Sequence, residues 1–282
     1  MRRFFAPAKV NLWLHVLGRR ADGYHELDSL VAFARIGDRV GFAPGGPLSL
    51  TIDGPFGAGL AGDADNLILR AARELASRVP GLILGAFALE KNLPLASGLG
   101  GGSSDAAAAL RALCAANRLP LDEPRVIAAA EATGSDVPVC LVPRARMMRG
   151  RGEIVGPPVG LPEMAVVLVN SGLAVSTPAV FAALALKPGQ SERSEPPRAQ
   201  SDWPARIAAA RNDLQNPAVA LAPAVADTLE RLAAAPGARR ARMSGSGATC
   251  FALFDDTAAA ARAARVLRRA LPDAWVRATR LG

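Results

Sequence analysis

The chain has 282 residues, of which half are hydrophobic and 21% are charged, and its formal net charge is +8. This balance is typical of a folded globular protein and excludes an intrinsically disordered chain. No segment carries the unbroken apolar run of about 20 residues that a membrane-spanning helix needs, so we expect no membrane partner.

The cysteine pattern and the N-terminal stretch both indicate a cytoplasmic protein. The cysteines are odd in number and widely spaced, which fits neither a disulfide framework nor a metal site; they are Cys114, Cys140 and Cys250. The apolar stretch near the N-terminus is interrupted by Lys9, Asn11 and His15, which argues against a signal peptide. We therefore expect reduced cysteines and a cytoplasmic location.

The positive charge alone is compatible with nucleic acid, an anionic membrane or a small polyanionic substrate as the partner. Many of the arginines lie in the last third of the chain, at helical spacing with alanine, which is typical of a solvated helix face. No aromatic residues are interleaved with them, as single-stranded nucleic acid binding would require. We expect no nucleic-acid partner.

The predicted elements begin with β structure. Residues 9–16 alternate between an apolar face and a polar face, which predicts a strand. Residues 26–36 and 38–53 continue as strand-like pieces, with breaks predicted at the dipeptide 37–38 and at residues 45–47.

Helices and strands are then mixed along the chain. The patterns predict helices at 66–78, 104–117, 123–133, 216–234 and 257–270, and strands at 85–90, 165–169, 239–247 (running into a loop), 248–254 and 274–279. Antiparallel strands with helices packed on one face, an α+β sandwich, would result. The polar, proline-bearing and aperiodic stretch 187–204 predicts a mobile surface insertion.

The stretch that points most directly to function is the glycine-rich run at residues 94–107, PLASGLGGGSSDAA, which lies between a predicted strand and a predicted helix. Glycines allow a backbone to approach a phosphate closely, and the free N–H groups of the next helix's first turn carry positive partial charge. The run lacks the Gly-Lys-Ser/Thr of a P-loop and the third glycine of a dinucleotide fingerprint. It therefore predicts a nucleotide phosphate site of another kind.

Three segments in this order resemble the signatures of the GHMP kinases, the superfamily of galactokinase, homoserine kinase, mevalonate kinase and phosphomevalonate kinase. They are residues 6–18 (APAKVNLWLHVLG), 94–107, and 242–254 (RMSGSGATCFALF). Further pieces resemble a branch of that superfamily whose acceptor carries a cytidine diphosphate group: residues 19–30 (RRADGYHELDSL), 134–138 (GSDVP), 175–181 (VSTPAVF) and 212–214 (NDL).

The resemblance implies a two-lobed α+β fold. Its N-terminal lobe, expected at residues 1–160, is similar to domain 2 of ribosomal protein S5 and binds ATP. Its C-terminal lobe, expected at residues 161–282, is a ferredoxin-like α/β sandwich that carries the polar insertion, and the active site lies in the cleft between the lobes.

The resemblance also implies a reaction: the γ-phosphoryl group of ATP, bound with Mg²⁺, passes to the 2-hydroxyl of a cytidine diphosphate-linked erythritol derivative in the non-mevalonate pathway of isoprenoid precursors. By the family pattern, Lys9 and Asp136 lie at the acceptor hydroxyl as the catalytic pair. From the residues alone, Asp136 could instead cap a helix and Lys9 could be an exposed lysine. Asp105 is left without an assignment, because an acid at a helix start caps the helix as readily as it binds magnesium.

The remaining site residues follow from the same pattern. ATP binding is expected at Pro94, Leu95, Ala96, Ser97, Gly98, Leu99, Gly100, Gly101, Gly102, Ser103 and Ser104, with Asn66 and Lys91 near the nucleotide. Substrate binding is expected at Asn11, Tyr24, His25, Thr177, Phe181, Gly245 and Ser246. The resemblance implies that Tyr24 and Phe181 stack on the two faces of the cytosine while His25 reads its edge, and His15 is expected to be structural.

Two other hypotheses remain open at this point. The chain could be a GHMP kinase of the homoserine or mevalonate type, although Tyr24, His25 and Phe181 argue for a base-bearing acceptor. It could also be a basic nucleic-acid-binding protein without catalysis. A monomer or a weak homodimer is expected.

Overall fold

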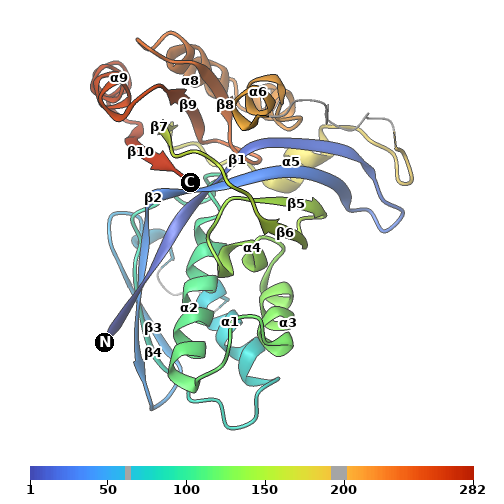
Figure 1. Cartoon of the computed structure of the whole chain (residues 1–282), viewed down its shortest axis with the longest axis vertical. Coiled ribbons are helices and arrows are strands. Elements are labelled where there is room, and N and C mark those ends of the chain that lie inside the picture. The colour runs from blue at the N-terminus through green and yellow to red at the C-terminus, as the bar shows by residue number, and fades with distance from the viewer. Residues whose placement is uncertain (61–64, 192–201) are drawn as a thin grey trace. The chain divides into compact units, whose positions relative to one another are not determined.

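The structure of the protein is a computed structural model that describes residues 1–60, 65–191 and 202–282 (Figure 1). The greater part of the predicted insertion, residues 192–201, lies outside the described residues. The chain forms two compact units that are interleaved in the sequence. Unit 1 comprises residues 1–9, 36–95 and 100–143, and unit 2 comprises residues 10–35, 96–99 and 144–282.

Two long strands, β1 (Arg2–Arg19) and β2 (His25–Pro44), pair with each other and contribute to both units. The predicted strand at 9–16 is confirmed, but its polar face is buried as deeply as its apolar face: Lys9, Asn11 and His15 are each at most 3% exposed. Polar groups buried to this degree need partners. The alternation along β1 therefore places apolar side chains on one buried face and polar side chains on another. It does not separate a buried face from a solvent-exposed face.

The break predicted within the second strand is wrong, because β2 runs without interruption through residues 37–38. Gly37 packs directly on the backbone of Ala6, where any side chain would collide. The Asp38 carboxylate is fully buried and accepts hydrogen bonds from the backbone N–H groups of Asn92 and Leu93. A Gly-Asp pair that resembles a turn is thus part of the strand's packing.

Unit 1 consists of a three-stranded sheet edge and a group of helices. Residues 39–44 of β2 pair antiparallel with β4 (Gly85–Glu90), and β3 (Ser49–Asp53) pairs parallel with β4. The helices are α1 (Leu67–Ala76), α2 (Gly101–Asn117), α3 (Pro124–Thr133) and α4 (Val137–Leu141), with a 3-10 turn at Ala58–Leu60. Helix α2 packs against α1, α3 and α4 (Figure 1).

Unit 2 holds the C-terminal sheet, whose strands lie in the order β10-β7-β9-β8 and are all antiparallel. The strands are β7 (Met164–Asn170), β8 (Arg240–Met243), β9 (Cys250–Phe254) and β10 (Trp275–Leu281). Helices α8 (Ala224–Ala233) and α9 (Thr257–Ala270) pack against them, as Figure 1 shows. The α+β class expected from the sequence is confirmed.

The other elements of unit 2 are short, and several were not predicted. Residues 27–31 of β2 pair with β5 (Arg146–Gly150), which pairs with β6 (Ile154–Pro158). The remaining helices are α5 (Thr177–Ala182), α6 (Trp203–Ala209) and α7 (Gln215–Leu221). The single helix predicted at 216–234 is in fact α7 and α8, because Pro223 has no backbone N–H with which to continue α7.

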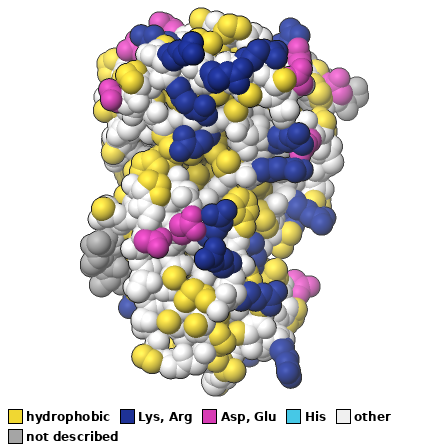
Figure 2. All heavy atoms as spheres, turned by 90° about the vertical axis from the view of Figure 1, so that its left-hand side faces the viewer, with side chains coloured by type: hydrophobic (Ala, Val, Ile, Leu, Met, Phe, Trp, Pro, Cys, Tyr) yellow, Lys and Arg dark blue, Asp and Glu magenta, His cyan; other side chains and the backbone are white. Residues whose placement is uncertain are grey.

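The described residues contain no helix that is long and apolar enough to cross a membrane. The three cysteines are free and buried, as expected. On the face drawn in Figure 2, Lys and Arg side chains form several separate groups, with hydrophobic and acidic side chains among them.

Helix α2 is unusual in its small side chains: Ala106, Ala107, Ala108 and Ala109 are all fully buried in succession. Four consecutive residues cover the whole circumference of a helix, so α2 is surrounded by protein at this level. Small side chains allow its neighbours to approach closely.

We predict that Ala108→Leu lowers the free energy of unfolding by about 1–3 kcal/mol, because a fully packed site cannot accept the added volume. Ala115→Leu is the matched control, since Ala115 lies on the same helix and is exposed. Urea denaturation measures both variants. Equal stability of the two would contradict the close packing around α2.

Candidate active site

The glycine-rich run leads into α2, and the start of this helix presents backbone N–H groups that are suited to binding an anion. Gly100 is the N-cap and makes no side-chain capping bond. The first N–H to bond inside the helix is that of Ser104, which donates to the Gly100 carbonyl at 2.9 Å. Among the described residues, the N–H groups of residues 101–103 have no acceptor. Free N–H groups at the positive end of a 17-residue helix bind phosphate readily.

Lys9 and Asp136, the predicted catalytic pair, lie together beside this helix start in unit 1. Lys9 Nζ is 3.1 Å from Asp136 Oδ2; the lysine side chain is 4% exposed and the aspartate side chain 34%. Asp136 occupies the N-cap position of α4 but accepts no capping bond there. Its carboxylate is therefore directed to the lysine, and it remains open to a ligand.

Gly100, at the start of α2, packs against the Lys9 side chain. A Cβ atom on Gly100 would lie 2.9 Å from Lys9 Cε, closer than real Cβ contacts, and the φ of Gly100 is +60°, in the left-handed region. Only glycine satisfies both conditions at this position. The lysine chain therefore runs directly along the backbone that carries the free N–H groups.

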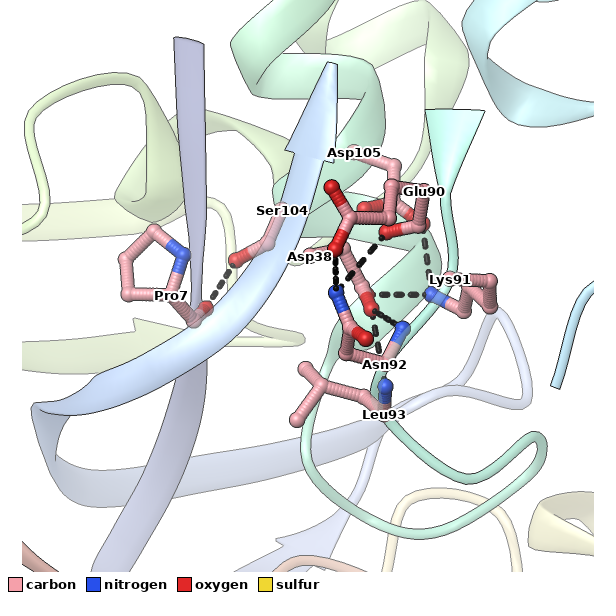
Figure 3. Close-up of polar contacts among 8 residues, drawn as sticks. All are labelled: Pro7, Asp38, Glu90, Lys91, Asn92, Leu93, Ser104 and Asp105. Atoms are coloured by element: carbon pink, nitrogen blue, oxygen red, sulfur yellow. Dashed lines mark hydrogen bonds and ion pairs between the residues drawn. The ribbon is translucent and has the colours of Figure 1, made fainter. Parts of the chain in front are cut away.

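Lys91 lies beside Gly101 at the helix start and takes part in a buried cluster (Figure 3). Its Nζ is 2.6 Å from Asp38 Oδ2 and 2.6 Å from Asp105 Oδ2, and all three side chains are at most 5% exposed. Asp38 comes from β2, Lys91 follows β4, and Asp105 lies in the second turn of α2. We call these residues the Lys91 triad; it ties two strands to the helix that begins at the glycine-rich run.

The triad has one ammonium group for two carboxyl groups. Burial, opposed by the charge of Lys91 and aided by that of Asp38, raises the pKa of Asp105 to about 8. Although burial works against it, the charges of Asp105 and Asp38 raise the pKa of Lys91 above its usual value. Near pH 7 the protonated form of Asp105 leaves the triad neutral. Asp105 Oδ1 is buried with no hydrogen-bond partner among the described residues.

Residues 96–99 of the run belong to unit 2, where the segment around Ser244 holds them. Ser244 Oγ donates to the Gly98 carbonyl at 3.0 Å and accepts the Asn11 N–H at 3.1 Å. The Thr249 N–H donates to the Ser97 carbonyl at 3.0 Å. The first half of the run is thus bound through its carbonyls, and its N–H groups are left for other contacts.

The predicted substrate residues all lie in unit 2 and form two groups. Thr177 Oγ1 and Ser246 Oγ are 2.7 Å apart and share a hydrogen bond. The rings of His25 and Phe181 lie 4.8 Å apart between centroids. Burial, followed by the charge of Arg19, lowers the pKa of His25, which favours a neutral ring that can both donate and accept.

Tyr24 does not form a ring pair with Phe181 in the described structure; it is 53% exposed, and the Arg151 guanidinium lies 5.0 Å from its ring centroid. Asn11 Nδ2 donates to Ser29 Oγ at 2.8 Å. Asn66 accepts from the Ile68 N–H and so caps α1. His15 is fully buried and accepts a bond from the Arg211 N–H, and burial lowers its pKa to about 4.

The sequence reasoning did not single out Asp38, Ser244 or Arg151. Ser244 lies inside the third matched signature, so a residue-by-residue reading of that signature could have found it. Asp38 was hidden by the turn-like dipeptide before it, and Arg151 has no local signal because its contact with Tyr24 spans more than a hundred residues.

The described residues contain no group of three or more His, Cys, Asp or Glu side chains that could hold a metal ion, so they offer no ready-made magnesium site. Mg²⁺ bound with a nucleotide needs fewer protein ligands, because it keeps several waters and takes one or two carboxylates together with phosphate oxygens. The Ser103 hydroxyl, in the first turn of α2, is an oxygen group of the kind that such an ion binds.

Two family models match the chain. Residues 66–144 match the GHMP kinases N terminal domain, and residues 199–273 match GHMP kinases C terminal. A protein of Methylorubrum extorquens (strain PA1) is 57% identical over 98% of this chain and 97% of its own length, and one of Xanthobacter autotrophicus is 53% identical over 100% and 99%. Both carry the name 4-diphosphocytidyl-2-C-methyl-D-erythritol kinase.

Solved structures agree. A crystal structure of 4-(cytidine 5'-diphospho)-2C-methyl-D-erythritol kinase matches with a TM-score of 0.82 at 37% identity, covering 100% of this chain and 99% of that one. L. major mevalonate kinase in complex with R-mevalonate matches with a TM-score of 0.66 at 18% identity over 100% and 96%, which shows the shared fold alone.

The raised pKa of Asp105 predicts how pH affects stability. A carboxyl group whose pKa is higher in the folded than in the unfolded chain stabilises the fold at low pH, and that contribution is lost as pH rises towards about 8. The stability of the wild type relative to Asp105→Asn, which cannot titrate, should therefore fall between pH 5 and pH 8.5.

Urea denaturation at the two pH values measures this difference. Asp122→Asn, at an exposed position, controls for the loss of one formal charge. If the free energy of unfolding of the wild type instead rose with pH relative to that of Asp105→Asn, Asp105 would not be protonated in the folded protein.

Proposed function

This chain belongs to the GHMP kinases, in the family of 4-diphosphocytidyl-2-C-methyl-D-erythritol kinases, and we propose that it transfers the γ-phosphoryl group of ATP to the 2-hydroxyl of 4-diphosphocytidyl-2-C-methyl-D-erythritol, giving the 2-phosphate and ADP. The observation that carries the proposal is the Lys9–Asp136 pair, 3.1 Å apart and packed against Gly100 at the start of α2. A base and a phosphate-binding surface thus lie side by side in unit 1. This reaction belongs to the non-mevalonate pathway of isoprenoid precursors.

Phosphoryl transfer depends on positioning and charge neutralisation more than on covalent help from the protein. The free N–H groups of residues 101–103 bind phosphate oxygens and hold the donor in line. Mg²⁺ brought in with ATP would neutralise part of the phosphate charge, and the Ser103 hydroxyl in the first turn of α2 would be a protein group available to hold it. ATP binding at residues 94–104, with Asn66 close by, remains part of the proposal.

Asp136 accepts the proton of the acceptor hydroxyl. A carboxylate is a much weaker base than an alkoxide, so the proton moves late, as the bond from oxygen to phosphorus forms. The Lys9 ammonium orients Asp136 and also offers hydrogen bonds to the acceptor oxygen. Because the Lys9 side chain is almost fully buried, the residues packed around it fix its position.

The cytidine end of the substrate is recognised in unit 2. Burial and the charge of Arg19 lower the pKa of His25, which favours the neutral ring; the ring lies on Phe181, and its free nitrogen is suited to hydrogen bonding with a base edge. His25 Nε2 is buried and has no partner among the described residues, which supports a role in binding a ligand. Tyr24 is exposed and supplies an aromatic face, and the Thr177–Ser246 pair supplies hydroxyl groups.

We propose that Lys91 acts indirectly and does not contact the nucleotide. It is 2% exposed, and both carboxylates of the triad take up its ammonium group. If Lys91 contributes to ATP binding, it does so by fixing the start of α2. The division into an ATP-binding domain at 1–160 and a C-terminal domain at 161–282 also remains a proposal, supported by matched ranges that lie on either side of that boundary.

Asp136→Asn should reduce kcat by about 10²–10⁴-fold, because an amide cannot accept the proton. ATP affinity should persist, since the helix N–H groups are unchanged. ADP release measures turnover and calorimetry measures nucleotide binding, with Asp122→Asn as the control. Retention of most activity by Asp136→Asn would show that another group is the base.

Tyr24→Ala should raise KM for the cytidine substrate about tenfold while kcat changes little, because loss of one aromatic contact removes roughly 0.5–1.5 kcal/mol beyond the buried area. Tyr24→Phe keeps the ring and should restore KM. Phe5→Ala is the control, because Phe5 is an exposed aromatic residue outside the site. If Tyr24→Ala has the wild-type KM, the cytosine does not contact this ring.

A further inference from the structure

A second concave site lies wholly within unit 2 and includes none of the proposed ATP or substrate residues. It is a cavity of about 330 Å³ on one side of β8. Its lining comes from the end of α5, the segment 211–217 and the strand itself: Ala183, Leu184, Arg211, Asn212, Asp213, Gln215, Asn216, Pro217, Arg240, Ala241 and Arg242.

The charge of this cavity is strongly one-sided. Three arginines and one aspartate line it, so its formal charge is +2. Arg211 forms an ion pair with Asp213 at 2.6 Å, which accounts for the acidic group. Among the described residues, neither Arg240 nor Arg242 has an acidic partner: Arg240 reaches only the Ala210 carbonyl at 3.4 Å.

Arg242 is the unusual member of the set, because it is 2% exposed and its positive charge is met only by backbone carbonyls. Its guanidinium donates to the carbonyls of Leu12, Ile207 and Ala210. Burial, and after it the charge of Arg240, lowers its pKa to about 10. Carbonyl dipoles satisfy its hydrogen bonds but do not cancel its charge, so the cavity keeps a positive field.

The uncharged side chains add donors that a ligand could use. Gln215 lines the cavity and accepts the Met243 N–H through its Oε1, while its amide nitrogen donates to no described residue. Asn216 is exposed, and its side chain makes no hydrogen bond with a described residue. Asn212, in contrast, is fully engaged: its Nδ2 donates to the carbonyls of Met243 and Gly245, both at 2.8 Å.

We propose that this cavity is a binding site for a small phosphate-bearing anion, a phosphate or diphosphate group held by Arg240 and Arg211 in the field of Arg242. Guanidinium groups bind phosphate oxygens through paired, charge-assisted hydrogen bonds, and the volume accommodates a group of this size. Through Asn212, an occupied site would also steady the turn that carries Gly245 and Ser246.

The test is titration calorimetry with inorganic phosphate and, separately, with pyrophosphate, at ionic strength held constant with chloride. No nucleotide is present, because the phosphates of a nucleotide would compete for the cavity. Any probe that binds at the proposed kinase site contributes equally to the wild type and to the cavity variants. The tighter of the two probes identifies whether the site is built for one phosphate or two.

Arg240→Gln should weaken binding by about tenfold or more, because a charge-assisted hydrogen bond is lost from each complex. Arg239→Gln is the matched control: Arg239 is the adjacent exposed arginine, pairs with Asp255 and does not line the cavity. It should bind as the wild type does. Asn216→Asp, which adds a negative charge at an exposed lining position, should also weaken binding.

Absence of binding to the wild type, or equal binding by Arg240→Gln and Arg239→Gln, would overturn the proposal. Because the comparison is between two neighbouring arginines, its outcome does not depend on whether the kinase assignment is correct. Kinase activity of Arg240→Gln, measured without either probe, should equal that of the wild type.

Discussion

The free end of helix α2 is the feature on which the proposed chemistry depends. A helix start without a side-chain cap presents unpaired N–H groups, and such an end is stable only where its surroundings fix the backbone firmly. Two lysines pack against this backbone. Lys9 runs along Gly100 to Asp136, and Lys91 lies next to Gly101 in a buried triad with Asp38 and Asp105. The glycines allow both approaches.

The two lysines differ in what their charges can do. Lys91 is surrounded by two carboxyl groups out of contact with solvent, so it stabilises an arrangement of strands and helix rather than a ligand. Among the described residues, Asp136 forms an ion pair with Lys9, and its side chain is a third exposed, so the pair can meet a substrate hydroxyl. The buried Lys91 triad therefore stabilises the fold, whereas the partly exposed Lys9–Asp136 pair can take part in a reaction.

Much of this could be predicted from the sequence, because the relevant signals are local or lie in matched signatures. The glycine-rich run before a helix, the choice of Lys9 and Asp136, which lie in contact, and the α+β class all follow from them. Contacts between distant residues could not be predicted in the same way. Asp38 looks like part of a turn until Asn92 and Leu93 are seen to donate to it, and Arg242 looks like a surface arginine until its three carbonyl partners are known. The alternation along β1 predicts one exposed face, so it could not indicate that both faces are buried.

The central claim is that the Lys9–Asp136 site phosphorylates a cytidine diphosphate-linked alcohol. The most direct measurement is ADP release from magnesium ATP with 4-diphosphocytidyl-2-C-methyl-D-erythritol, mevalonate and homoserine offered in turn to the purified protein. ADP should form at a substantial rate only with the first acceptor. Turnover with mevalonate or homoserine, and none with the cytidine-bearing alcohol, would contradict the assignment.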